Sequence, residues 1–255
     1  MTRGGPRPFV VGNWKMNLGE ESARKLIHAL VATLPFDRVD AAIAPAFPCL
    51  RAALDASANT PLAVGAQNVH WQDKGAFTGE VAPMMLVEMG VRFVIVGHSE
   101  RRALFGETDE TVSRKVGAAA RHGLIPILCV GESAEQHREG RTREVVVTQV
   151  RAAVADFALG TPGELVVAYE PVWAIGTGLT PRPADVTGAH RAIRAALAER
   201  LGDHAAEVRI LYGGSVIADN ALSLLESAEV DGALVGGASL DPVAFGAIAA
   251  AAASC

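Results

Sequence analysis

Residues 165–171 read LVVAYEP, an uninterrupted apolar run that ends in a glutamate followed by a proline. Continuous apolar runs of this length are typical of parallel strands that are covered on both faces. Seven further runs of this kind recur along the chain: FVVGN (9–13), AAIAP (41–45), LAVGAQ (62–67), RFVIVGHS (92–99), IPILCVGE (125–132), VRILYGGS (208–215) and GALVGG (232–237). The sequence therefore predicts eight strands.

Helical patterns lie between these runs, most clearly at residues 19–34, 108–121, 183–201 and 241–253. Thr108 before an acidic turn, and Asp241 before a proline, are signals for the start of a helix. Strands that alternate with helices over 255 residues predict an α/β fold, a single (β/α)8 barrel that takes up residues 1–255 as one domain. A doubly wound open sheet is the alternative, but it rarely needs eight repeats.

The composition argues against several classes of partner. The net charge is −5 and no run of Lys and Arg stands out, so we do not expect a nucleic acid to be the principal partner. The three cysteines, Cys49, Cys129 and Cys255, lack metal-ligand spacing, and Cys129 sits in an apolar run as a core thiol would. No stretch is long and apolar enough to span a bilayer, and the N-terminus lacks the apolar region of a signal peptide. These features predict a cytoplasmic protein that binds no membrane.

Polar residues and glycines stand where the predicted strands end. In (β/α)8 barrels the active site lies at the C-terminal ends of the strands, so residues at these ends should meet at one mouth. The residues in question are Asn13, Lys15, Gln67, Asn68, His98, Ser99, Glu100, Glu132, Glu170, Gly213, Gly214, Ser215, Gly236 and Gly237.

The glycine pairs after the seventh and eighth strands predict a phosphate site. Backbone N–H groups at glycines can approach an anion closely, and this position is a recurrent phosphate site in such barrels. Glycine also eases tight turns anywhere in a protein, so one pair alone would mean little. Two pairs on adjacent strands, with Ser215 and the IGTG segment (175–178) nearby, favour a phosphate cradle.

Glu170 is the candidate general base. An ordinary glutamate at a strand end is solvated or forms a salt bridge. Here we expect apolar neighbours such as Val172 and Trp173 to raise its proton affinity. The segment PVWAIGTG (171–178) has a stiff proline at one end and two glycines at the other, which is typical of a lid that closes over a base and excludes water.

His98 and Lys15 are the candidates for stabilising negative charge. An isolated histidine is more often a core residue, but His98 precedes a helix whose first amides can hold its imidazole neutral, as a hydrogen-bond donor. Lys15 could be a surface lysine, yet after an apolar strand it fits a fixed cation for an anionic substrate. His70, His122 and His190 are interpreted as loop or helix-surface residues.

A base, a neutral electrophile, a fixed cation and a phosphate cradle together predict a class of reaction. A proton is removed from the carbon next to the carbonyl of a phosphorylated compound, and the enediolate is stabilised by His98, Lys15 and Asn13. Return of the proton to the neighbouring carbon completes an aldose–ketose isomerisation, for which we expect neither a metal nor a cofactor.

Eight motifs carry a resemblance to a known family. They are GNWKMN (12–17), GAQN (65–68), GAFTGE (75–80), VGHSERR (96–102), CVGE (129–132), AYEPVWAIGTG (168–178), YGGS (212–215) and VGGASL (235–240). In this order and spacing, the chain resembles the triosephosphate isomerases from end to end. The resemblance implies a TIM barrel and an enzyme of glycolysis and gluconeogenesis.

The resemblance also implies roles for single residues. Glu170 would be the base and His98 the electrophile, a pairing known for this family. Lys15 would supply the positive charge, Asn13 would line the site, and Glu100 would support it. The phosphate would be held by Gly176, Ser215, Gly236 and Gly237.

Lid and assembly are implied in the same way. Residues 171–178 would form the lid, and the loop around Thr78 would reach into a second subunit of a homodimer. One departure from the family is Leu179-Thr180-Pro181 after the lid, where a basic residue is usual. It leaves the catalytic groups intact but affects lid opening, since proline restricts the residue before it.

Other functions are compatible with parts of this pattern. An isomerase of a longer sugar phosphate, such as a tetrulose phosphate, would use the same residues with a longer pocket. A non-catalytic barrel that serves as a scaffold should have lost Lys15, His98 or Glu170, and all three are present. An aldolase of the Schiff-base kind would want a lysine on a middle or late strand, where this chain has Glu170.

Overall fold

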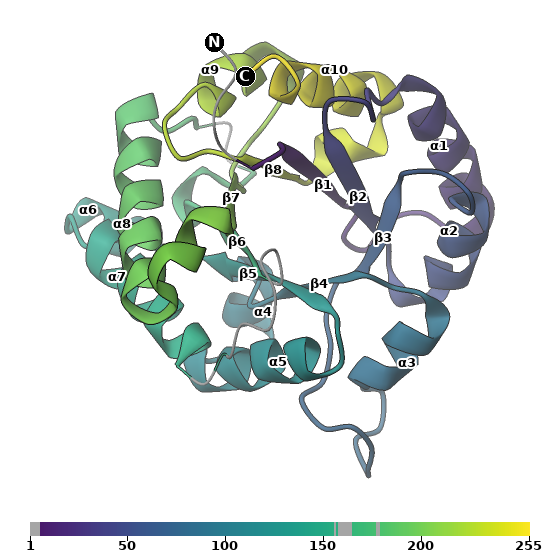
Figure 1. The fold of residues 1–255 in the computed structure, drawn as a ribbon, viewed down its shortest axis with the longest axis horizontal. Coiled ribbons are helices and arrows are strands. Elements are labelled where there is room, and N and C mark those ends of the chain that lie inside the picture. The colour runs from purple at the N-terminus through teal and green to yellow at the C-terminus, as the bar shows by residue number, and fades with distance from the viewer. Residues whose placement is uncertain (1–5, 156, 158–164, 177–178) are drawn as a thin grey trace.

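Eight parallel strands form a closed barrel in the computed structural model, which describes residues 6–155, 157, 165–176 and 179–255 (Figure 1). The strands pair in chain order, and the barrel closes where β1 pairs with β8. Their bounds are β1 Phe9–Asn13, β2 Asp40–Ala44, β3 Ala63–Ala66, β4 Phe93–Val96, β5 Ile125–Val130, β6 Val166–Tyr169, β7 Arg209–Tyr212 and β8 Gly232–Val235. All eight predicted strands and the barrel are confirmed.

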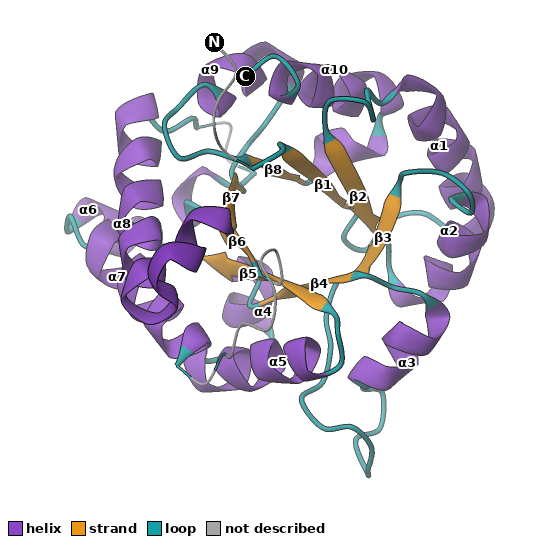
Figure 2. Ribbon diagram, in the orientation of Figure 1, coloured by secondary structure: helices purple, strands orange, loops and turns teal. Residues whose placement is uncertain are grey.

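Helices surround the barrel as an outer ring (Figure 2). Their bounds are α1 Glu20–Thr33, α2 Leu50–Ala56, α3 Pro83–Met89, α4 Ser99–Leu104, α5 Asp109–Arg121, α6 Ala134–Arg138, α7 Thr142–Val154, α8 Pro183–Leu201, α9 Ala218–Leu225 and α10 Pro242–Ala252. The four predicted helices correspond to α1, α5, α8 and α10. The predicted caps are present: the side chain of Thr108 accepts from the amide of Thr111, and that of Asp241 accepts from the amides of Val243 and Ala244.

Two layers of side chains explain why the strands read as continuous apolar runs. One layer fills the barrel and includes Val11, Ile95 and Leu211; the other, which includes Val10 and Ile43, packs against the helices. Both faces of each strand are therefore buried, as expected for a parallel sheet. Cys129 belongs to the inner layer, which confirms the predicted core thiol.

A close approach of two strand ends sets the position of the predicted base. Gly131 follows β5, and a Cβ at this residue would lie 1.7 Å from the carbonyl oxygen of Glu170. The backbone amide of Glu170 donates to the carbonyl of Val130 at 2.7 Å, so the segments that follow β5 and β6 continue side by side beyond the two strands. Glycine at position 131 is thus a requirement of the backbone around the site.

His190 lies in the protein interior, so its interpretation as a surface residue is wrong. It is fully buried on α8, its ring makes an edge contact with Tyr169, and its Nδ1 lies 2.8 Å from the carbonyl oxygen of Glu229. Burial lowers the pKa of His190 to about 4. The other two histidines fit the interpretation: His70 lies in the loop after β3, buried and stacked on Trp71, and His122 lies at the end of α5, partly exposed and paired with Asp73.

We predict that His190 makes the protein sensitive to acid. The folded state keeps this imidazole neutral down to about pH 4, whereas the unfolded chain protonates it near pH 6.5, so the unfolded state binds more protons between these values. The free energy of unfolding should therefore fall as the pH drops through this window, by about 3 kcal/mol in total. Urea unfolding of the wild type and of His190→Gln between pH 4 and 8 measures the difference.

The matched control is His204→Gln, since the side chain of His204 is 61% exposed. We expect this variant to follow the pH dependence of the wild type, and His190→Gln to show a shallower one. Equal slopes in all three proteins would contradict the prediction.

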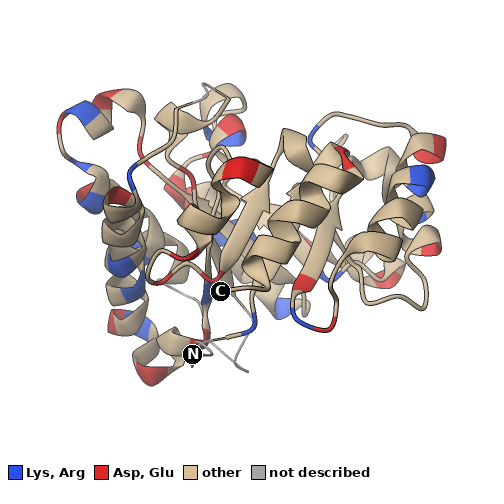
Figure 3. Cartoon of the chain, turned by 90° about the horizontal axis from the view of Figure 1, so that it is seen from above, with Lys and Arg blue, Asp and Glu red and all other residues tan. Residues whose placement is uncertain are grey.

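Charged residues of both signs are interspersed along the outer helices (Figure 3). Within the described ranges, no helix is long and apolar enough to cross a membrane. The same part of the chain contains no group of three His, Cys, Asp or Glu residues that could hold a metal ion.

Candidate active site

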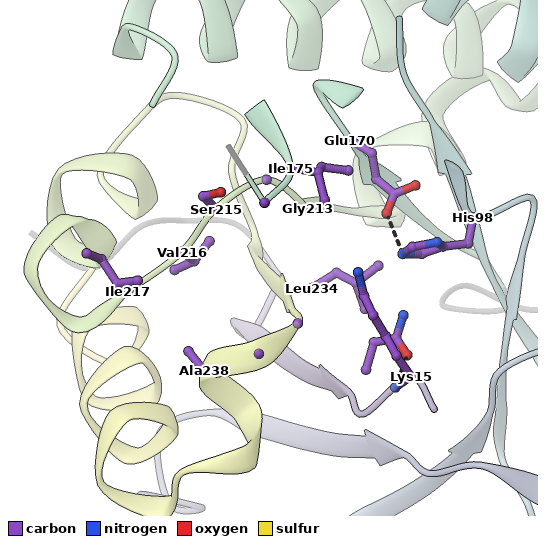
Figure 4. Close-up of a pocket in the computed structure, with 15 residues that line it drawn as sticks. Lys15, His98, Glu170, Ile175, Gly213, Ser215, Val216, Ile217, Leu234 and Ala238 are labelled. Atoms are coloured by element: carbon purple, nitrogen blue, oxygen red, sulfur yellow. Dashed lines mark hydrogen bonds and ion pairs between the residues drawn. The ribbon is translucent and has the colours of Figure 1, made fainter. Parts of the chain in front are cut away.

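A pocket of about 230 Å³ opens at the C-terminal end of the barrel. It is lined by Asn13, Lys15, His98, Glu170, Ile175, Gly176, Gly213, Gly214, Ser215, Val216, Ile217, Leu234, Gly236, Gly237 and Ala238. Glu170, His98 and Lys15 lie on one side of this pocket, and Ser215, Val216 and Ala238 face them from the other (Figure 4). Every residue predicted for catalysis or phosphate binding, except Glu100, lines this one pocket.

The carboxylate of Glu170 is buried and hydrogen-bonded through both oxygens. Its Oε1 lies 2.9 Å from Nε2 of His98, the contact drawn as a dashed line in Figure 4. Its Oε2 accepts from the backbone amide of Ser99, in the first turn of α4, at 2.9 Å. The strand end after β6 and the helix start after β4 therefore place the predicted base and electrophile in contact.

The predicted increase in the proton affinity of Glu170 is wrong for this arrangement. Burial raises the pKa of Glu170, but the charge and hydrogen bond of His98, the amide of Ser99 and the charge of Lys15 together outweigh burial, and the pKa is lowered. Trp173 is not among the residues that line the pocket, and its Nε1 donates to Glu132 at 2.8 Å. Glu170 is thus an ion at neutral pH while it contacts His98.

His98 contacts an amide at the start of α4, as expected for a neutral imidazole. It also contacts Glu170, which favours the protonated imidazole. Its Nδ1 accepts from the amide of Glu100 at 3.3 Å, which leaves Nε2 to carry the proton toward Glu170. Burial lowers the pKa of His98, but the charge and hydrogen bond of Glu170, with a smaller effect of Glu100, raise it overall. A ligand oxygen that displaced Glu170 from Nε2 would remove the main cause of this increase.

Lys15 reaches the pocket from a strained backbone. Its φ is +52°, in the left-handed region that non-glycine residues adopt at a cost of about 1–3 kcal/mol. Two neighbouring amides hold it: the amide of Lys15 donates to Oδ1 of Asn13 at 3.1 Å, and Nε2 of Gln67 donates to the carbonyl of Lys15 at 2.7 Å. Strain at this position indicates that the direction of the Lys15 side chain matters.

Glu100 lies behind Lys15 and His98 rather than in the pocket. Its Oε1 is 2.5 Å from Nζ of Lys15, and its Oε2 is 3.6 Å from Nδ1 of His98. These contacts match the supporting role implied by the family resemblance. Glu100 also borders a neighbouring cavity of about 330 Å³, which shares Asn13, Lys15 and His98 with the pocket.

The wall opposite the base is made largely of backbone. Gly214, Ser215, Gly236 and Gly237 line it, and the hydroxyl of Ser215 donates to the carbonyl of Ala174 at 2.7 Å. That bond ties the segment after Glu170 to the loop after β7. Gly176 lines the pocket at the end of this segment, while Thr177 and Gly178, which complete the predicted lid, lie outside the described residues.

Three of the residues expected at the mouth do not line this pocket. Glu132 is fully buried behind the segment that follows β6, where its Oε1 accepts from Tyr169 and Trp173. Gln67 and Asn68 border the neighbouring cavity, and Asn68 accepts from Lys115 at 2.7 Å. A polar residue at a strand end can thus face a neighbouring loop instead of the mouth.

Two groups that hold the site residues in place were not predicted from the sequence. Gln67 bridges the carbonyls of Lys15 and Ala44, and so fixes the strained lysine. The amide of Ser99 holds Glu170. The position of Gln67 after a strand was a signal for a polar function, but its partners could not be known without the fold; the amide contact has no sequence signal at all.

The fold and the pocket define a (β/α)8-barrel isomerase, in which a carboxylate and a histidine meet opposite a glycine-lined wall. The family model described as triosephosphate isomerase matches residues 8–252. Proteins named triosephosphate isomerase from Moorella thermoacetica and Chloroflexus aurantiacus are 48% and 50% identical to this chain over 95% and 93% of its length, and 97% and 96% of theirs.

A crystal structure of the triosephosphate isomerase from Bartonella henselae superimposes with a TM-score of 0.88 at 39% identity, over 96% of this chain and 98% of that one. The chain belongs to the triosephosphate isomerase family. The predicted family and enzyme class are therefore confirmed.

Proposed function

We propose that this protein interconverts D-glyceraldehyde 3-phosphate and dihydroxyacetone phosphate, with Glu170 as the base, His98 as the electrophile and Lys15 as the electrostatic stabiliser. The observation that carries these assignments is the contact of Glu170 with His98 at 2.9 Å, on the side of the pocket that faces the glycine wall. Membership of the family supports the substrate.

The phosphate group binds at the glycine wall. Gly176, Ser215, Gly236 and Gly237 line this end of the pocket, where three of the four have no side chain to cover the backbone. A dianion is stabilised there by amide dipoles and by the charge of Lys15. This end of the pocket lies opposite Glu170 and His98, so a bound phosphate directs the carbonyl end of a three-carbon substrate toward them.

Proton transfer follows from the contacts of Glu170. The carbonyl oxygen of the substrate accepts the hydrogen bond from Nε2–H of His98. Oε1 of Glu170 is then free, and the carboxylate loses the main stabilisation of its negative charge. The carboxylate then accepts the proton from the carbon next to the carbonyl, and the electron pair of the C–H bond forms the enediolate. His98 and Lys15, with Asn13 beside them, stabilise the oxygen that gains charge. Return of the proton to the neighbouring carbon, together with transfer of the hydroxyl proton to the oxygen that carried the negative charge, gives the isomer.

Turnover of D-glyceraldehyde 3-phosphate in the presence of a metal chelator tests the proposal. Rapid turnover that resists the chelator is expected, since the steps above use only side chains and backbone of this chain. The absence of turnover by the folded protein would reject the substrate. A preference for a tetrulose phosphate would favour the isomerase of a longer sugar phosphate instead.

A homodimer is the proposed assembly. The loop between β3 and α3 projects from the barrel (Figure 1), and its residues Phe77 and Thr78 are exposed. Met16, whose side chain is 94% exposed, lies at the cavity next to the pocket, together with exposed Phe105. The projecting loop of a second subunit would cover these apolar side chains and close the site from that side.

We predict that Phe77→Asp converts the dimer to a monomer and lowers activity at the same time. An aspartate at this position would bring a charge into the apolar contact, whereas the exposed loop leaves the barrel itself intact. Sedimentation equilibrium at micromolar concentration measures the mass. Leu222→Asp, an exposed leucine on α9, is the control and should keep the mass of the wild type. A wild-type monomer, or an unchanged mass in Phe77→Asp, would contradict the proposed interface.

The remaining assignments follow from the proposed reaction. We place the protein in the cytoplasm, in glycolysis and gluconeogenesis, and we treat residues 1–255 as one catalytic domain. Strands from β1 to β8 contribute to the same barrel, which supports the single domain.

A further inference from the structure

We propose that His137 is a positioning residue for the segment Pro171–Gly176, which follows the base, and that the charge of its imidazole tunes how firmly this segment is held. His137 lies on α6, outside the pocket. The effect on the segment is independent of the substrate, whereas the effect on turnover rests on the proposed function.

His137, Glu132 and Trp173 form a cluster that we call the hinge clamp. The rings of His137 and Trp173 stack with centroids 4.2 Å apart and an angle of 21° between their planes. Oε1 of Glu132 accepts from Nε1 of Trp173 at 2.8 Å and lies 3.4 Å from Nδ1 of His137. The indole is therefore held on its face by the histidine and at its edge by the carboxylate.

The hinge clamp acts on the segment that carries the lining of the pocket. Trp173 is the middle residue of the 3₁₀ turn Val172–Ala174, and the amide of Val172 donates to the carbonyl of Glu132 at 3.1 Å. Glu170 precedes this turn, and Ile175 and Gly176 after it line the pocket. Trp173 can leave its present position only by breaking the stack with His137 and the hydrogen bond to Glu132.

Protonation of His137 strengthens both of its contacts. An imidazolium over the face of an indole gains a cation–π attraction, and beside the carboxylate of Glu132 it gains an ion pair. Histidine is the side chain whose charge ordinarily changes between pH 5 and 8. A fall in pH across this range therefore tightens the hinge clamp and favours the position of the segment seen here.

The groups around His137 are consistent with this direction. Glu132 faces it from the loop after β5. The pKa of Asp185 on α8 is lowered mainly by its hydrogen bond with Arg182, and His137 makes a small further contribution. Asp185 is paired with Arg182 at 2.9 Å. Thr142 on α7 lies 3.5 Å from Nδ1. On α6 itself, the charged residues are Glu135 and Arg138, and Glu139 and Arg141 follow it.

The test uses the indole N–H signal of Trp173 in protein labelled with ¹⁵N-tryptophan. The chain has three tryptophans, so the signal is assigned by its loss in Trp173→Phe. In the wild type we expect this signal to follow one titration curve between pH 5 and 8. In His137→Phe, which keeps a stacked ring without a charge, the curve should vanish; in His137→Arg the signal should stay at one position across the range.

The matched control is His204→Phe, because His204 is another histidine beside a glutamate, 3.8 Å from Glu207, but lies outside the hinge clamp. It should keep the curve of the wild type. A curve that persists in His137→Phe, or its absence from the wild type, overturns the proposal. Neither outcome requires turnover, so the result is independent of the proposed reaction.

The kinetic consequence is measured as the ratio of kcat at pH 6 to kcat at pH 8. We expect this ratio to be roughly threefold higher in His137→Phe than in the wild type, which is the effect of one weak cation–π contact. Equal ratios would overturn the link between the hinge clamp and turnover.

Discussion

Replacement of Glu170 by glutamine is expected to lower kcat by ~10²–10⁴-fold, the range over which a positioned acid or base contributes to catalysis. Glutamine has nearly the same volume and can still accept from the amide of Ser99, so the fold and the pocket should be preserved. It cannot accept a proton from carbon at neutral pH. The loss should therefore appear in kcat, measured with D-glyceraldehyde 3-phosphate near pH 7.

Binding of a phosphorylated compound separates this effect from damage to the pocket. In Glu170→Gln the affinity for inorganic phosphate, measured as competitive inhibition or by calorimetry, should stay near that of the wild type because the glycine wall is untouched. Glu199→Gln changes an exposed glutamate on α8 in the same way and should leave kcat unaltered. Turnover near the wild-type rate in Glu170→Gln would remove Glu170 from the role of base.

The residues of the pocket could be predicted from the sequence because barrel topology converts chain position into location. Asn13 ends a buried strand, His98, Glu170 and Ser215 follow one, and parallel strands of a closed barrel end at one mouth. The predicted barrel topology therefore placed side chains from distant parts of the chain together. The same reasoning failed for Glu132, since a side chain just past a strand can turn outward toward the next loop.

Electrostatic properties could not be predicted in this way. The pKa of Glu170 depends on whether burial or its partners dominate, and His98 and the amide of Ser99 are 72 and 71 residues away in the chain. Their contact within 2.9 Å reverses the direction that the apolar neighbours suggested. His190 failed for a different reason: it lies on the buried face of α8 with Val186, Ile193 and Leu197, and the helical spacing of these apolar residues was not applied to the histidine among them.

For Lys15, the sequence predicted the position of the residue and the structure shows how it is held. The sequence located it after the first strand, but only the structure shows that its backbone is left-handed and that Asn13 and Gln67 hold it there. Strain of this kind persists when the surroundings fix the residue firmly, and it is concentrated at functional sites. Of the described residues that line the pocket, Lys15 is the only one with a fixed positive charge.

Lys15→Met is therefore expected to lower kcat/KM by about 10²–10³-fold, comparable to the loss of one strong group that stabilises the charge of a transition state. Methionine keeps the length of the side chain and the same backbone strain, so the change isolates the charge. Without it, Glu100 and Glu170 face an anionic substrate uncompensated, which weakens phosphate binding as well as the enediolate. Lys25→Met, which removes a lysine paired with Glu21 on the surface, should leave kcat/KM unchanged. If Lys15→Met also kept kcat/KM within a few-fold of the wild type, the charge of Lys15 would have no part in catalysis, and the left-handed backbone at this position would need another explanation.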